Sequence, residues 1–180
     1  MRTYISLLRG INVSGQKSIK MNALSESYER LGFANIKTYL QSGNVIFDVK
    51  EQAVSIIKER ISQQIKLDFG YDVPVIVLDV DGLQQIVSGN PFLADEGKDQ
   101  SFFHVTFLSP TAQSDNFDEV EKKKQGNEEI LLRDNTIYLY CPNGYGKTKL
   151  TNNFIESKLK TTATTRNWKT VTELLKIASQ

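Results

Sequence analysis

The chain has 180 residues, 22 of them basic and 21 acidic, so its formal net charge is +1. That balance gives the whole chain no electrostatic footprint for nucleic acid. Its single cysteine excludes an internal disulfide and any metal site built from several cysteines. A chain of this length buries enough surface to fold without a disulfide or metal.

The sequence predicts no membrane segment. No run approaches the roughly 20 apolar residues that a helix needs to cross a bilayer. The first apolar run meets a charge at Arg9, too early for a signal peptide. Because one unpaired cysteine agrees with a reducing compartment, we expect a cytoplasmic protein with no membrane partner.

The first 79 residues predict six elements in the order strand, helix, strand, strand, helix, strand. The strongest helical pattern is a stripe of Val54, Ile57, Ile61 and Ile65, which Gly70 closes. The six predicted elements cover residues 4–8, 21–31, 35–40, 45–49, 51–69 and 73–78. This order is that of a ferredoxin-like unit.

A turn-rich stretch over 88–100 separates this half from the next. Before it, Asp81 is expected to cap a short helix that runs to Val87, and near the end of the chain Asn167 is expected to cap a final helix. The predicted elements after residue 100 are strand 102–108, helix 117–123, strands 130–132 and 137–140, helix 150–159, strand 161–165 and a helix from 168 onward.

We therefore predict an α+β fold. It is a tandem duplication of ferredoxin-like β-α-β-β-α-β units, with largely antiparallel sheets and extra linking and C-terminal helices. The first unit spans 1–79, a linker with a short helix spans 80–100, and the second unit with the C-terminal helix spans 101–180. Only the order of elements carries the inference of duplication, because the halves share no visible sequence.

Four polar loops at strand or helix ends are the candidate binding regions, at 9–17, 41–44, 143–149 and 161–167. Residues 141–180 hold 7 basic and 2 acidic residues, a net charge of +5, which favours a small anionic ligand. The candidate ligand-binding residues are Arg9, Asn12, Gln41, Ser42, Asn44, Asn143, Lys149, Arg166 and Asn167. Turn formation alone also explains these residue types.

Two of these loops could each bind a phosphate or another anion near the start of a helix. The Gly-Lys-Thr string that ends at Thr148 lacks the first glycine of a P-loop, because Cys141 takes its place, and Pro142 removes a backbone donor. A looser anion nest at a helix N-terminus stays open for this string. For the last loop, the alternatives are an anion at the next helix start, or plain capping by Asn167 with Arg166 on the surface.

The sequence contains no recognisable catalytic constellation, so whether the protein is an enzyme stays open. A Cys141–His104 pair is conceivable, but a buried thiol and a core imidazole explain both residues better. Asp79 and Asp81 are too few for a metal site. We expect neither a metal nor a cofactor.

Two other functions remain as alternatives. A ferredoxin-like sheet could bind single-stranded nucleic acid on exposed rings, with Tyr39, Phe47, Tyr138 and Tyr140 as candidates. A protein-interaction module would instead show an exposed sheet edge or an apolar patch. The sequence predicts no oligomeric state.

Several runs in order match a known pattern. They are LLRGINV at 7–13, LGF at 31–33, TYLQSGNV at 38–45, YLYCPNG at 138–144, KLTN at 149–152 and TTRNW at 164–168, followed by Thr170 and Val171. In these runs the chain resembles the bacterial domain-of-unknown-function family 1697 over almost its whole length.

The resemblance implies a two-unit α+β fold of ferredoxin-like type. It implies no activity, so no catalytic residue is carried over. The chain departs from the pattern at Ser14, where the family often has a second glycine, and at Lys147-Thr148, where Arg-Ser is expected. The second departure makes the Gly-Lys-Thr string a local feature of this chain.

Overall fold

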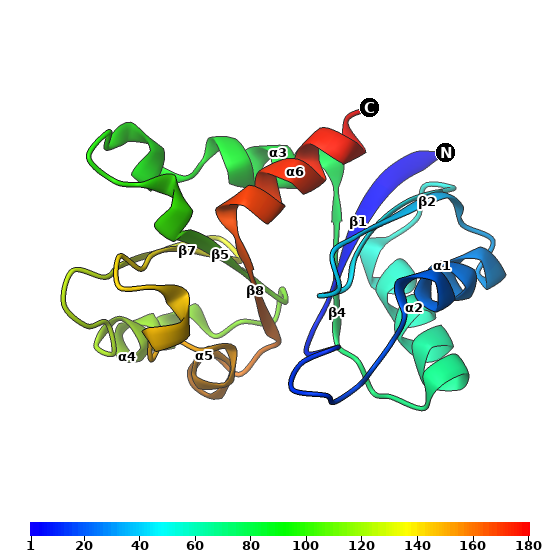
Figure 1. Cartoon of the computed structure of the whole chain (residues 1–180), viewed down its shortest axis with the longest axis horizontal. Coiled ribbons are helices and arrows are strands. Elements are labelled where there is room, and N and C mark those ends of the chain that lie inside the picture. Colours follow the sequence, from blue (N-terminus) through cyan, green and yellow to red (C-terminus); the bar gives the residue numbers. More distant parts are fainter. The chain divides into compact units, whose positions relative to one another are not determined.

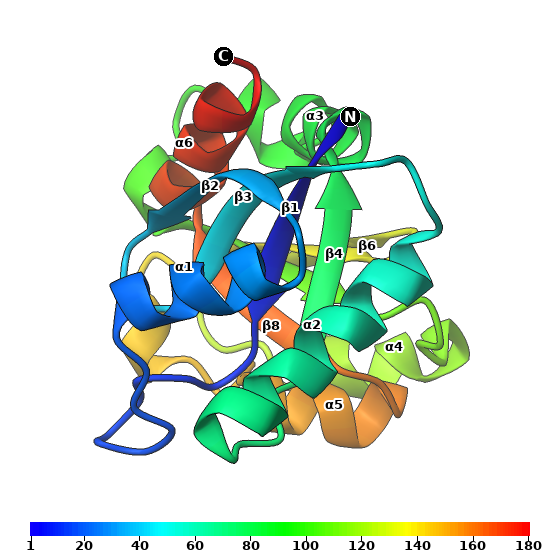
Figure 2. The same cartoon turned by 90° about the vertical axis from the view of Figure 1, so that its right-hand side faces the viewer.

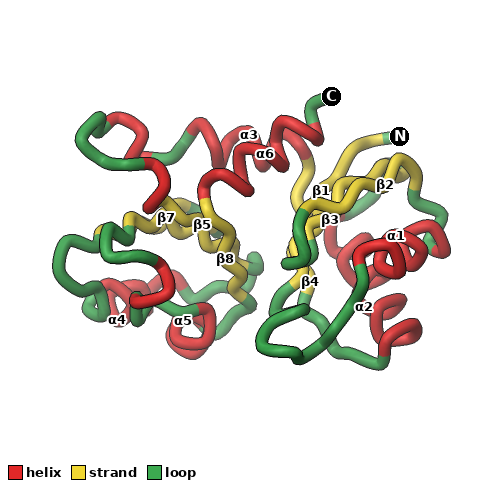
Figure 3. Tube along the Cα trace, viewed as in Figure 1, coloured by secondary structure: helices red, strands yellow, loops and turns green.

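The computed structural model describes all residues, Met1–Gln180. Contacts divide the chain into two compact units: Met1–Gln85 with Leu174–Gln180 form unit 1, and Ile86–Glu173 form unit 2. Figure 1 labels the elements, and Figure 3 colours the same chain by secondary structure. The end of the C-terminal helix groups with unit 1, whereas the sequence assigned all of 101–180 to one unit.

Unit 1 contains the six expected elements in the expected order. They are β1 (Arg2–Leu8), α1 (Met21–Arg30), β2 (Ala34–Tyr39), β3 (Asn44–Val49), α2 (Val54–Phe69) and β4 (Val75–Asp79). The sheet order is β2-β3-β1-β4, and every neighbouring pair is antiparallel. Figure 2 shows α1 and α2 over one face of this sheet.

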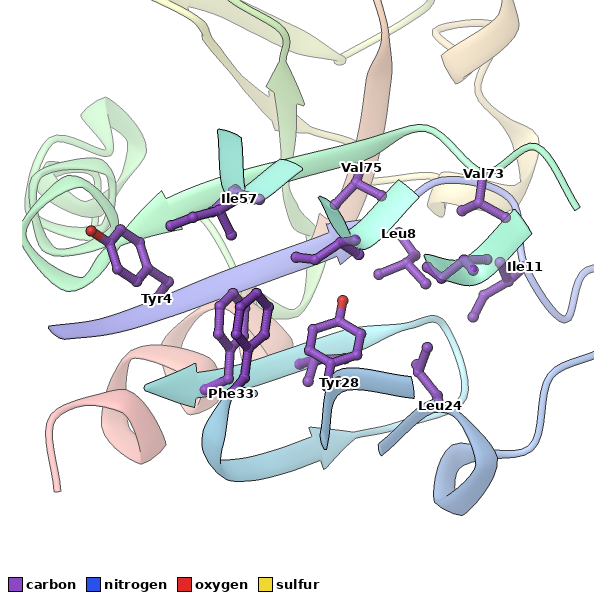
Figure 4. Close-up of a cluster of buried hydrophobic side chains, with 14 of the residues drawn as sticks. Tyr4, Leu8, Ile11, Leu24, Tyr28, Phe33, Ile57, Val73 and Val75 are labelled. Atoms are coloured by element: carbon purple, nitrogen blue, oxygen red, sulfur yellow. The ribbon is translucent and has the colours of Figure 1, made fainter. Parts of the chain in front are cut away.

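The core of unit 1 lies between the sheet and these two helices. Strand side chains alternate between faces, so Tyr4 and Leu8 of β1 point toward the helices and belong to the same buried cluster as Tyr28, which Figure 4 shows. In the same layer, the rings of Phe33 and Phe47 stack with centroids 4.7 Å apart. The apolar stripe of α2 supplies Ile57, Ile61 and Ile65, all fully buried, as its spacing predicted.

Unit 2 repeats the same order of elements. Its elements are β5 (Phe103–Leu108), α4 (Phe117–Glu121), β6 (Glu129–Arg133), β7 (Thr136–Tyr140), α5 (Asn152–Leu159) and β8 (Ala163–Asn167). The sheet order is β6-β7-β5-β8, again antiparallel throughout. Strand β5 lies between β7 and β8 and is an interior strand of this sheet. The chain is therefore a mixed α/β protein with two antiparallel four-stranded sheets.

Two further helices, α3 (Val80–Ser88) and α6 (Trp168–Ala178), extend across the division between the units. The prediction that Asp81 caps α3 is wrong, because the helix already begins at Val80. The carboxylate of Asp79 lies one residue earlier and accepts a hydrogen bond of 2.7 Å from the Gly82 N–H. Turn residues of the predicted linker form two short 3₁₀ turns, Pro91–Ala94 and Gln100–Phe102.

Candidate functional site

The first polar loop of unit 1 is held to the hairpin loop by Asn12. Its Nδ2 donates to the Gln41 carbonyl at 2.7 Å and to the Ile19 carbonyl at 3.0 Å, and its Oδ1 accepts from the Ile19 N–H at 2.8 Å. Asn12 has a positive φ of 54°, which asparagine tolerates better than most residues. The structure thus brings Asn12 and Gln41 together, with the amide of Asn12 used to join the loops.

The hairpin loop between β2 and β3 is also closed by its own polar groups. Asn44 is fully buried, and its Nδ2 donates to the Tyr39 carbonyl at 2.7 Å and to Ser42 Oγ at 3.0 Å. Gly43 has a φ of +86°, and a Cβ there would lie 2.7 Å from Leu8 Cβ. Glycine is therefore required for the close approach of this loop to β1.

The remaining predicted residues outside loop 143–149 have defined places. Arg9 is half-buried at the end of β1, where its backbone N–H donates to the Pro74 carbonyl. Arg166 is 7% exposed rather than on the surface, and its Nη1 donates to Thr164 Oγ1 at 2.7 Å. Asn167 Oδ1 accepts from the Thr170 N–H at 2.8 Å, which is the predicted capping of α6.

The loop after β7 runs as a series of turns before α5 begins. The Gly144 N–H donates to the Cys141 carbonyl, and the Thr148 N–H donates to the Tyr145 carbonyl. Helix α5 begins at Asn152, and its cap is Thr151, whose Oγ1 accepts from the Phe154 N–H. The Gly-Lys-Thr string therefore ends before this helix, and the anion nest at a helix N-terminus is not formed.

A buried carboxylate, Glu128, lies beside this loop. The ladder between β6 and β7 pairs Glu129 with Tyr140, so one step further along the strands Glu128 comes opposite Cys141. Glu128 is only 5% exposed, and its Oε1 accepts from the Gln125 N–H at 2.7 Å. The carboxylate thus closes the turn that leads into β6.

Four polar side chains from these two segments line one cavity of about 330 Å³. They are Gln125 and Glu128 from the turn before β6, and Asn143 and Lys147 from the loop after β7. Asn143 and Lys147 are exposed, and their side chains form no hydrogen bond or ion pair within the protein. Lys149 is exposed as well but does not line the cavity. We take this cavity as the candidate site.

The thiol of Cys141 interacts with Glu128 and is fully buried. Burial raises the pKa of the Cys141 thiol to about 12, with a further upward contribution from the negative charge of Glu128 and a smaller opposing one from Thr148. A thiol with so high a pKa is almost wholly protonated at neutral pH and is a poor nucleophile. Cys141 therefore has the structural role that the sequence favoured for it.

His104 of β5 has Tyr145 rather than Cys141 as its neighbour. The two rings stack with centroids 4.6 Å apart and planes 18° apart. Burial lowers the pKa of the His104 imidazole, against a smaller upward effect of its hydrogen bond with the Phe102 backbone. The imidazole is therefore neutral at pH 7 and supports the loop after β7 by stacking.

Two of the four rings considered for nucleic-acid binding are unavailable. Phe47 is fully buried in the core of unit 1, and Tyr138 is 2% exposed, with its hydroxyl donating to the Ile86 carbonyl at 2.8 Å. Tyr140 is half-buried, with the Lys98 ammonium 5.2 Å from its ring centroid. Stacking of bases on Phe47 or Tyr138 is thus excluded in this fold.

The sequence missed Gln125, Glu128 and Lys147 as residues of one cavity. A glutamate just before a strand is usually solvated, and no local pattern distinguishes Glu128 from its neighbour Glu129. The distinguishing property is its position opposite Cys141, which depends on the register between β6 and β7. Of the nine residues predicted from the sequence, Asn143 is the one that lines this cavity.

Two general properties of the structure bear on function. No helix is both long and apolar enough to cross a membrane. The chain also brings together no group of three His, Cys, Asp or Glu side chains that could hold a metal ion.

The fold and the cavity together define a two-unit α/β protein with a polar cavity in its second unit. Comparison of its sequence with family models identifies the family. The family model described as "Protein of unknown function (DUF1697)" matches residues 1–138. The chain belongs to this family, as its sequence runs indicated. No curated protein matches it.

A solved structure confirms the fold. The conserved bacterial protein SP0830 from Streptococcus pneumoniae is similar to this chain with a TM-score of 0.79 and 19% sequence identity, over 98% of each chain. At this identity the similarity shows the fold alone.

Proposed function

We propose that the chain binds a small anionic ligand and that the site is the cavity of unit 2. The observation that carries the proposal is that Asn143 and Lys147 line one cavity while neither side chain has a partner within the protein. An amide and an ammonium placed together are hydrogen-bond donors suited to a carboxylate or phosphate. The cavity volume of about 330 Å³ fits a small metabolite.

The carboxylate of Glu128 restricts the class of ligand. Glu128 lines the cavity and is buried, and its carboxylate has acceptor positions beyond those that the Gln125 N–H and the Cys141 thiol occupy. Its negative charge repels a second anionic group and attracts a hydroxyl or an ammonium. The supported ligand is therefore a small molecule with one anionic group and a hydroxyl or ammonium group, with its anionic end toward Lys147.

Calorimetric titration with four small compounds tests this function. Lactate and alanine carry the second polar group, propionate lacks it, and phosphate represents a doubly charged anion. We expect lactate or alanine to bind more tightly than propionate or phosphate. Replacement Lys147→Met should weaken that binding about 10- to 100-fold, the range for a lost charge-assisted hydrogen bond.

The matched control is Lys149→Met. Lys149 has the same charge, lies two residues away and does not line the cavity, so its replacement should leave the affinity unchanged. Equal losses in the two variants would show that general charge, and not this cavity, attracts the anion. Absence of binding by all four compounds would reject the proposed ligand class.

We also propose that the two units are copies of one ferredoxin-like unit and that the protein is cytoplasmic. The shared element order and the shared sheet order support the duplication. The single, fully buried cysteine thiol agrees with a reducing compartment. A structural superposition of 1–79 on 101–167 tests the first proposal, and localisation of a tagged chain by cell fractionation tests the second.

A further inference from the structure

A second hollow, of about 300 Å³, lies in unit 1 on the sheet face away from α1 and α2. Thr3, Asp48 and Ile46 contribute to it from neighbouring strands, since Thr3 pairs with Asp48 and Ile46 follows two residues from Asp48 on the same face. The end of α6 covers it with Ile177 and Ala178. The hollow therefore combines apolar side chains with polar ones, among them the carboxylate of Asp48.

The carboxylate of Asp48 is fixed in place and ionised. Thr3 Oγ1 donates to its Oδ1 at 2.6 Å, and Asn35 Nδ2 donates to its Oδ2 at 2.7 Å. These two hydrogen bonds, that of Asn35 foremost, lower the pKa of Asp48. Because a carboxylate has about four acceptor positions, two remain for a ligand.

The end of α6 adds to the negative potential of this hollow. Ile177 and Ala178 are the last residues of that helix, so the hollow lies at its C-terminal end. A helix C-terminus carries a partial negative charge that attracts cations. Asp48 and the helix end therefore favour the same sign of ligand charge.

One resident cation, Lys37, also lines the hollow. The charge of the N-terminal ammonium, and to a smaller extent that of Lys37, contributes to the lowered pKa of Asp48. Lys37 is exposed and forms no ion pair with that carboxylate or any other, so Asp48 has no direct cationic partner there. Lys37 also opposes the entry of a second cation through charge repulsion.

We propose that this hollow is a binding site for a small organic cation, with an ammonium or guanidinium against Asp48 and a short apolar stem against Ile46 and Ile177. Neither the anion cavity of unit 2 nor the family match assigns such a site. It is opposite in charge preference to the proposed site of unit 2, so the two proposals succeed or fail separately.

Titration followed by amide NMR tests the site with three probes of equal chain length: butylamine, butanol and butyrate. Butylammonium should shift the signals of Thr3, the Asn35 side-chain amide and Ile177, and butyrate should not. Larger shifts of these signals with butanol or butyrate than with butylammonium would overturn the proposal.

Two variants and a control sharpen the test. Asp48→Asn should weaken butylammonium binding at least about 10-fold, because it removes the charge at nearly constant shape. Asp68→Asn should leave it unchanged, although Asp68 also accepts side-chain hydrogen bonds, from Ser27 and Gln64, because Asp68 does not line the hollow. Wild-type affinity in Asp48→Asn would overturn the proposal.

Lys37→Met keeps the proposal testable if Asp48→Asn fails to fold. Lys37 is exposed and unpaired, so its loss should not affect folding. It removes the repelling charge, and butylammonium binding should strengthen about two- to fivefold. Unchanged or weaker binding in this variant would contradict a site in which a cation contacts Asp48.

Discussion

The polar loops of the two units contain similar residues but use them differently. In unit 1, Asn12 donates an amide hydrogen to the Gln41 carbonyl of the neighbouring loop, and Asn44 donates one to the Tyr39 carbonyl of its own hairpin. In unit 2, Asn143 lines a cavity and donates to no protein group. The comparison shows that an asparagine after a strand is structural when a backbone carbonyl of its own or a neighbouring loop lies within reach of its amide, and available when none does.

Gly43→Ala should have the largest effect on stability. A Cβ at residue 43 would lie 2.7 Å from Leu8 Cβ and 2.8 Å from Ile11 Cδ1, and the φ of +86° disfavours any side chain. We expect the free energy of unfolding to fall by about 3 kcal/mol or more, from overpacking and backbone strain together. Urea denaturation measures this change.

Gly144→Ala is the matched comparison in unit 2. Gly144 also has a positive φ, of 94°, but a Cβ there would have nothing within 4 Å. Only the backbone strain of a positive φ remains, so the free energy of unfolding should fall by about 1–2 kcal/mol. Equal losses of unfolding free energy in the two variants would show that the close contact of the hairpin with β1 does not contribute to the destabilisation by Gly43→Ala.

Asn12→Ala should have the next largest effect. The change removes three hydrogen bonds and leaves the partly buried Ile19 N–H without its acceptor. We expect a loss of about 2–3 kcal/mol. Asn143→Ala, measured in the same urea series, should change stability by less than about 0.5 kcal/mol, because that amide has no partner to lose. A large loss for Asn143→Ala would refute the contrast between the loops.

The smallest effect should be the contribution of histidine to the pH dependence of stability, which only unit 2 provides, since it contains the one histidine. Burial lowers the pKa of His104 from its ordinary 6.5, so the unfolded chain takes up a proton before the folded chain does. The contribution of His104 to stability should therefore fall as the pH decreases from about 6.5 to the lowered pKa, and change no further below it.

His104→Phe tests this origin, because phenylalanine keeps a ring against Tyr145 and cannot titrate. Urea unfolding, followed by the fluorescence of Trp168 in unit 2, gives the free energy of unfolding at pH 7 and at pH 5. The difference between these two free energies should be smaller in the variant than in the wild type. An unchanged difference would show that carboxylates, and not His104, cause the pH dependence.

Local sequence patterns predicted most of the fold. Helical spacing located α1 and α2, and the strand patterns over 130–132 and 137–140 located β6 and β7. The capping residue of α3 was predicted wrongly, because Asp79 and Asp81 lie two residues apart and either carboxylate satisfies the local pattern of a helix cap. The residue at which β4 ends decides which of the two caps the helix.

The candidate site was predictable only in part. The sequence placed Asn143 in a polar loop, and this was sufficient to include it. It could not pair that loop with Gln125 and Glu128, because the pairing depends on the register of two strands and on the turn that precedes them. In unit 1 the hydrogen bonds of Asn12 could not be predicted for a similar reason, because its partners lie 7 and 29 residues away in the sequence.

The buried thiol of Cys141 gives this protein a natural reporter of opening. It is the only cysteine of the chain, it is inaccessible in the folded state, and unit 1 has none. A thiol reagent can therefore modify the protein only when the core of unit 2 opens, since exposure and thiolate formation both require it. Pulse labelling of the unaltered chain would thus follow the opening of one unit separately from the other, without any introduced probe.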